Sequence, residues 1–219
     1  MQCRSPVAVT AWIGMLGLSA GLAFGRPDAS PLGSAPVRLA DLDQAFTRIV
    51  DTPPASAEWA TGRLHLRKAR FFLERFEASP ALREAVDRQL DLAASCLNRL
   101  RSESLPAPSP GFREEAYYCD TDGSVQPFLR YIPKTPLDAG AKRPLLVFLH
   151  GYNPYLNLVN WVGSVPENLA AFAEREGFAV AAPFGRGNTD YQAIGEQDVL
   201  TVIETMKSRM LDAIRSELW

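Results

Sequence analysis

The stretch Arg143–Gly151, RPLLVFLHG, decides the fold of this chain. Its apolar run from Leu145 to Leu149 is typical of a strand that other elements bury on both faces. The run ends abruptly at His150 and Gly151, which predicts a sharp turn at the carboxyl end of the strand. Such a turn can present backbone N–H groups to negative charge that develops in a reaction. The same residues could instead simply end a buried strand.

Two strand-like runs come before this central strand. Phe112–Cys119 and Val125–Ile132 flank the tetrapeptide Thr121–Ser124. Its Asp-Gly pair between two strand-like runs is a strong signal for a β-hairpin. We therefore expect an antiparallel hairpin ahead of the central strand.

After the central strand, helices and strands alternate. The pattern predicts a helix over Pro166–Glu176, an apolar strand over Phe178–Ala182 and a long helix from about Glu196. Ser164 and Glu167 can form a capping box at the first of these helices, and the glycine after it suits the left-handed residue that ends a helix. The expected fold class is therefore α/β, with an antiparallel hairpin followed by parallel strands.

A small helical unit is expected in front of the sheet. Helical spacing starts near Leu42, and a second helix is predicted over about Ala57–Ala78. Ser79 can cap a third helix, with Pro80 in its first turn. The chain thus divides into a signal peptide (1–25), a flexible leader (26–38), a helical unit (39–103) and a sheet domain (112–219).

The first residues are typical of an export signal. Met1–Arg4 carries a positive charge, Pro6–Phe24 is apolar, and small residues stand at Ala23 and Gly25. We expect a secreted or periplasmic protein; the alternative is an uncleaved membrane anchor. In an oxidising compartment Cys96 and Cys119 could form one disulfide, or remain two buried thiols.

Composition excludes several kinds of function. The formal net charge is −2, from 23 basic and 25 acidic residues, and no Lys/Arg run occurs, so we expect no nucleic-acid partner. The cysteines and histidines lack the spacing of a zinc site, and no phosphate-binding glycine loop is present. We therefore expect neither a metal nor a cofactor.

Three motifs resemble secreted esterases of the α/β-hydrolase superfamily, in the prolyl-oligopeptidase-like and polyhydroxybutyrate-depolymerase-like groups. The motifs are His150–Asn153, the loop Pro183–Thr189 and the helix start Gly195–Val199, in the order and spacing of that family, and the resemblance covers about Phe112–Arg209. It implies hydrolysis of a small carboxylic ester or a peptide through a serine. The expected oxyanion donors are the backbone N–H groups of Tyr152 and Asn153, with Gly151 allowing close approach and His150 packing behind the turn.

The same resemblance implies a catalytic triad that we do not find. The serine should sit in a G-x-S-x-G turn after the last helix, followed by an acid and a histidine. The one such motif, Gly17–Gly21, lies in the expected signal. We expect His65 on a helix surface, and capping or dipole roles for the acids of the last motifs, Asp190, Glu196 and Asp198.

Three interpretations follow. The first is an exported serine-hydrolase relative that was cut short after its fourth strand and is inactive as this chain. The second is a non-catalytic module that binds a ligand above Tyr152 and Arg186. The third is a fragment that another chain completes. Without a neighbouring nucleophile strand, Leu145–Leu149 should form an unpaired, aggregation-prone edge.

Overall fold

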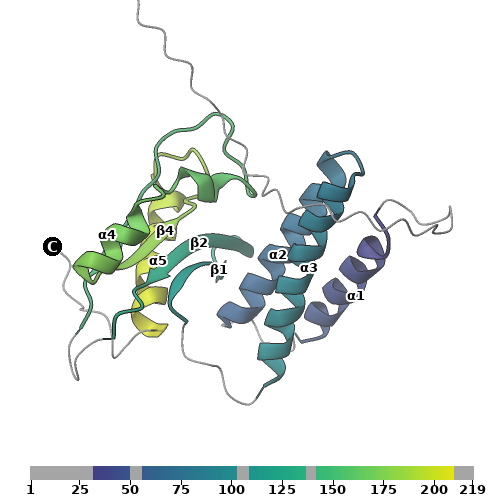
Figure 1. Cartoon of the computed structure of the whole chain (residues 1–219), viewed down its shortest axis with the longest axis horizontal. Helices are drawn as coiled ribbons and strands as arrows, with labels where there is room; N and C mark the ends of the chain where they lie inside the picture. The colour runs from purple at the N-terminus through teal and green to yellow at the C-terminus, as the bar shows by residue number, and fades with distance from the viewer. Residues whose placement is uncertain (1–31, 50–55, 103–108, 137–141, 210–219) are drawn as a thin grey trace, which may run out of the picture.

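The computed structural model describes residues 32–49, 56–102, 109–136 and 142–209 (Figure 1). Within them the chain forms, in order, α1 (Ala35–Arg48), α2 (Ala57–Arg75), α3 (Pro80–Arg101), β1 (Gly111–Cys119), β2 (Ser124–Ile132), β3 (Leu145–Val147), a 3-10 helix η1 (Trp161–Ser164), α4 (Leu169–Glu176), β4 (Ala179–Pro183) and α5 (Ile194–Arg209). This combination confirms the α/β class. The expected signal peptide lies outside the described residues, and no helix among those described is long and apolar enough to cross a membrane.

The sheet combines an antiparallel hairpin with a parallel pair. β1 pairs antiparallel with β2, and Gly123, at a φ of 67°, closes the hairpin by donating to the carbonyl of Cys119. β2 then pairs antiparallel with β4, and β4 pairs parallel with β3, which makes the strand order β1-β2-β4-β3. In the described part of the chain β3 pairs with β4 alone, so the expected edge position of this strand is confirmed.

Helices cover both faces of the sheet. Successive strand residues point to opposite faces, and apolar side chains on each face pack against a helix. One face packs against Val202 and Met206 of α5 through Tyr117, Cys119, Phe128, Ala179 and Ala181. The other face meets α2 at its β1 end and α4 at its β4 end. Figure 1 shows the strands between the α1–α3 unit on the right and α4 on the left.

The helical unit begins and ends largely where local signals place it. The Ser79 hydroxyl accepts a hydrogen bond from the Leu82 N–H at 3.1 Å, and Pro80 occupies the first turn of α3. α1 begins earlier than expected, at Ala35, inside the stretch interpreted as a flexible leader. Ala35 and Leu39 are buried against the other helices, and this packing explains the early start.

The interpretation of His65 as a surface histidine is wrong. α2 lies between α3 and β1, so one side of its charged stretch is enclosed while Arg67 and Arg70 stay exposed. His65 is 4% exposed, and its Nδ1 lies 2.9 Å from the side-chain oxygen of Gln89 on α3. Desolvation by burial lowers the pKa of His65 from its ordinary value of 6.5. Lys68, one turn further on, is also 4% exposed.

One smaller expectation also needs correction, and one choice between two alternatives is decided. No capping box forms between Ser164 and Glu167, because η1 and a turn occupy this stretch and α4 begins only at Leu169. Gly177 ends α4 in the left-handed conformation, as expected. Cys96 and Cys119 are free buried thiols in different core clusters, so no disulfide joins them.

Candidate oxyanion site

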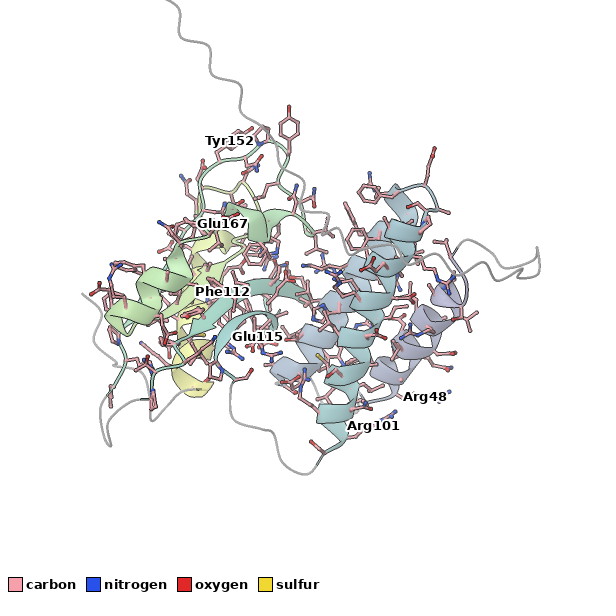
Figure 2. All side chains as sticks on the ribbon, in the orientation of Figure 1. Arg48, Arg101, Phe112, Glu115, Tyr152 and Glu167 are labelled. Atoms are coloured by element: carbon pink, nitrogen blue, oxygen red, sulfur yellow. The ribbon has the colours of Figure 1, made fainter. Side chains whose placement is uncertain are left out.

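The loop that follows β3 carries the candidate oxyanion donors. Phe148 continues the ladder for one more bond, to the carbonyl of Ala181 at 2.8 Å, and the chain then leaves the sheet. Tyr152 is 74% exposed, and Figure 2 shows it on the loop above the sheet at the edge of the molecule. A Cβ built at Gly151 would meet no atom within 4 Å. Within the described residues the Tyr152 N–H has no acceptor, so it can donate to an incoming oxygen.

Asn153, the second expected donor, is already occupied. Its N–H donates to the side-chain oxygen of Asn188 at 3.1 Å. The side-chain amide of Asn188 donates back to the Asn153 carbonyl at 2.7 Å. Because an N–H makes one strong hydrogen bond at a time, Asn153 is not available to a substrate in this geometry. Of the two expected donors, Tyr152 alone is open.

His150 anchors the turn from behind. Its ring is buried beside Phe184 and Tyr191, with Nε2 3.0 Å from the Phe184 carbonyl and Nδ1 3.0 Å from the Gly151 carbonyl. Carbonyl oxygens only accept hydrogen bonds, and a neutral imidazole has a single N–H to donate. Because each ring nitrogen already lies against a backbone carbonyl, neither is free to accept a proton from a serine, and His150 is not placed to act as a general base.

The loop after β4 has an unusual backbone. Arg186, Asp190, Tyr191 and Ala193 all have φ between 49° and 62°, a region that residues other than glycine seldom occupy. Each such residue costs on the order of 1 kcal/mol or more, so surrounding contacts must hold the loop. Tyr191 makes two of them: its hydroxyl accepts from the His150 N–H at 3.0 Å and donates to the Pro183 carbonyl at 3.2 Å.

Arg186 fixes this loop to the rest of the domain. Its guanidinium binds both carboxylate oxygens of Asp198 on α5, at 2.9 and 3.2 Å, and also pairs with Asp122 in the hairpin turn. The Tyr117 hydroxyl donates to the same Asp198 at 2.5 Å. Asp198 is 1% exposed, so the expected dipole role is wrong for this residue: it is the buried acceptor of a four-residue cluster.

The cluster changes the acid–base properties of its members. Its hydrogen bonds hold the pKa of Asp122 below the usual range, mainly through Arg186. Burial opposes the charge on Arg186, but the hydrogen bonds to Asp122 and Asp198 outweigh it and raise the pKa of Arg186. Because the N–H groups of this guanidinium donate to two carboxylates, the Arg186 side chain is committed to contacts within the domain.

Metal binding and general-base catalysis each make requirements of the side chains in the described residues. No group of three or more His, Cys, Asp or Glu side chains among them could hold a metal ion. Their histidines, His65 and His150, are bound to Gln89 and to backbone carbonyls. The G-x-S-x-G at Gly17–Gly21 lies outside the described residues.

Sequence reasoning missed Asn188 and Tyr191. Their partners, Asn153 and His150, lie 35 and 41 residues away along the chain, and no periodic pattern links such loop positions. Comparisons of the chain with models of protein families, with curated proteins and with solved structures find no match. The functional assignment therefore depends on the geometry of the site.

Proposed function

We propose that residues 111–209 are the oxyanion-binding part of a serine hydrolase of the α/β-hydrolase type, which cleaves a carboxylic ester or a peptide bond. One observation carries this proposal: the Tyr152 N–H, which has no acceptor among the described residues, lies on the loop that follows β3, the parallel edge strand. In this class of enzyme, one oxyanion donor comes from the loop after the corresponding strand, and the other from the residue after the serine.

The strand order supports the same proposal. β4 lies between β2 and β3, antiparallel to β2 and parallel to β3. The other edge of β3 is unpaired in the described residues, so one further strand can pair there. A nucleophile strand paired there would bring its serine turn to the same end of the sheet as Tyr152. β1, β2, β3 and β4 would then support the site and Tyr152 would polarise the carbonyl, while the serine, acid and histidine would come from elsewhere.

In the reaction, the serine oxygen would attack the carbonyl carbon, and the carbonyl oxygen would become an anion. An N–H held in place for this anion lowers the barrier by about 3–4 kcal/mol. The leaving alcohol or amine would depart with a proton, and water would then release the acid. No step calls for a cofactor. The apolar stretch Pro6–Phe24 supports export, so we place this reaction outside the cytoplasm.

The genomic sequence offers a direct test. The DNA beyond the codon for Trp219 is read in all three frames, and we expect one frame to encode a strand, a G-x-S-x-G turn and then an acid and a histidine. The chain extended in that frame should be labelled once by a fluorophosphonate, which forms a covalent bond to an activated serine with loss of fluoride. The 219-residue chain is the matched control and should stay unlabelled. Absence of the turn from every frame would contradict the proposal in this form.

The third interpretation, a fragment completed by another chain, is favoured by one observation. In the described residues β3 has an unpaired edge with Leu149 46% exposed beside it, and such edges readily accept a strand from another chain. If no frame encodes the turn, the chain isolated from its own source under native conditions should elute with a second chain that carries the serine, and light scattering should give the complex a defined mass. A stable monomer would contradict this second candidate.

A further inference from the structure

The side chain of Asn188 makes a two-point contact with the backbone of the oxyanion loop. It accepts from the Asn153 N–H at 3.1 Å and donates to the Asn153 carbonyl at 2.7 Å. An asparagine amide is the shortest side chain that offers an acceptor and a donor side by side, as this pairing requires. No other side chain among the described residues binds the backbone of Asn153 or Tyr152.

From this contact we infer that Asn188 is a positioning residue, which selects the Tyr152 N–H as the oxyanion donor by occupying the N–H of Asn153. The inference rests on the proposed function and extends it to a residue that never touches the substrate. Asn188 fixes the N–H and the carbonyl of Asn153, the residue after Tyr152. The Gly151 carbonyl, in the same peptide group as the Tyr152 N–H, lies 3.0 Å from Nδ1 of His150. Together these contacts constrain the orientation of the Tyr152 N–H before a substrate arrives. Such preorganisation is the source of the catalytic effect of an oxyanion donor.

The position of Asn188 within its loop supports this role. The loop is held on one side by Arg186, paired with Asp198 and Asp122. On the other side, the Tyr191 hydroxyl accepts from the N–H of His150. Asn188 stands between these two anchors, so its amide is presented from a fixed frame although the residue itself is exposed. The residues that make these two anchoring contacts, Arg186 and Tyr191, both have φ in the left-handed region.

Hydrogen exchange of the whole 219-residue chain, followed at each amide by NMR, tests the inference. In the unmodified protein the Asn153 N–H should exchange slowly and the Tyr152 N–H rapidly. Asn188→Ala removes both contacts and should speed exchange at Asn153 about fivefold, the factor expected for one hydrogen bond. Asn188→Asp keeps the acceptor but loses the donor, so it should retain most of the protection at Asn153.

Asn168→Ala is the matched control, because Asn168 is another exposed asparagine and its side chain makes no capping hydrogen bond to α4. It should leave both amides unchanged. Equal exchange at Asn153 in the unmodified and Asn188→Ala proteins would overturn the role of Asn188. Slow exchange at Tyr152 in the unmodified protein would instead contradict the proposed function, because that amide would not be open. The two failures are therefore distinguishable, and an unchanged thermal midpoint in Asn188→Ala separates positioning from general stability.

Discussion

At the scale of single residues, the polar groups that surround the site are committed to holding it together. Asp198, Tyr191 and His150 are residue types that often act in catalysis, yet each binds a partner from another part of the chain. A buried side chain that is hydrogen-bonded to a partner stabilises the fold, whereas a catalytic acid or base must lie within hydrogen-bond reach of the substrate. The backbone N–H of Tyr152, by contrast, has no acceptor among the described residues.

His65 should make the stability of the fold depend on pH. Its pKa in the folded state is lowered by burial, so the unfolded chain binds a proton more readily below the ordinary value of 6.5. The free energy of unfolding should therefore fall as the pH drops from 7.5 to 5. His65→Gln, which cannot take up a proton, should flatten this dependence.

Urea unfolding at each pH measures the effect, and His150→Gln is the control for the other histidine in the described residues. The explanation would be wrong if the chain with His65 were no less stable at pH 5 than at pH 7.5. Glu114, Lys68 and Arg99 also act on this imidazole, so each comparison keeps these three residues unchanged.

At the scale of elements, close approach between helices sets the shape of the helical unit. α1 crosses α2 at Gly62, where an added Cβ would lie 2.1 Å from the ring of Phe46. Phe46 is fully buried, so its ring has no free space to move into. Glycine at this position is therefore required for packing, although it lies within a helix.

Gly62→Ala should destabilise the protein by about 2 kcal/mol, because overpacking outweighs the gain in helix propensity. Thermal or urea unfolding measures the change. Gly163→Ala is the matched control, since a Cβ there meets nothing within 4 Å, and it should be close to neutral. Phe46→Leu combined with Gly62→Ala should recover part of the loss. A neutral Gly62→Ala would mean that α1 does not pack as described.

Element positions could largely be predicted from the sequence, and side-chain partners could not. Ser79 with Pro80, the Asp-Gly turn at Gly123 and the glycine after α4 act on their own neighbours, so a local pattern reveals them. The burial of His65 depends on α3 and β1 packing on either side of α2. The occupation of Asn153 by Asn188 depends on two loops meeting in space, which no single stretch of sequence encodes.

At the scale of the whole molecule, the helical unit and the sheet are joined through a buried ion pair. Lys68 of α2 binds both carboxylate oxygens of Glu114 on β1, and the indole N–H of Trp161 donates to Glu114 at 3.0 Å. Trp161 is fully buried in the loop region that leads from the oxyanion turn to α4. Glu114 thus links the helical unit to Trp161, and the hydrophobic core continues between the two parts through Ala116 and Val125.

Lys68→Met should cost about 3–5 kcal/mol, since it leaves the Glu114 carboxylate buried without its cation. Adding Glu114→Gln should restore more than half of this loss, because the amide oxygen can still accept from Trp161. A double-mutant cycle in urea measures the coupling. Arg88→Ala, which breaks an exposed pair with Glu84, is the control and should change stability by about 0.5 kcal/mol or less. Additive effects of the two buried changes would show that the pair does not join the two parts.

The kcat for ester hydrolysis by the serine-bearing form tests the central claim most directly, in a comparison of Tyr152→Pro with Tyr152→Ala. Proline removes the backbone N–H at this position, whereas alanine keeps it and removes only the exposed ring. We predict that kcat falls about 100- to 1000-fold in Tyr152→Pro and stays near the unmodified value in Tyr152→Ala. An unchanged kcat in Tyr152→Pro would show that this amide does not stabilise the oxyanion.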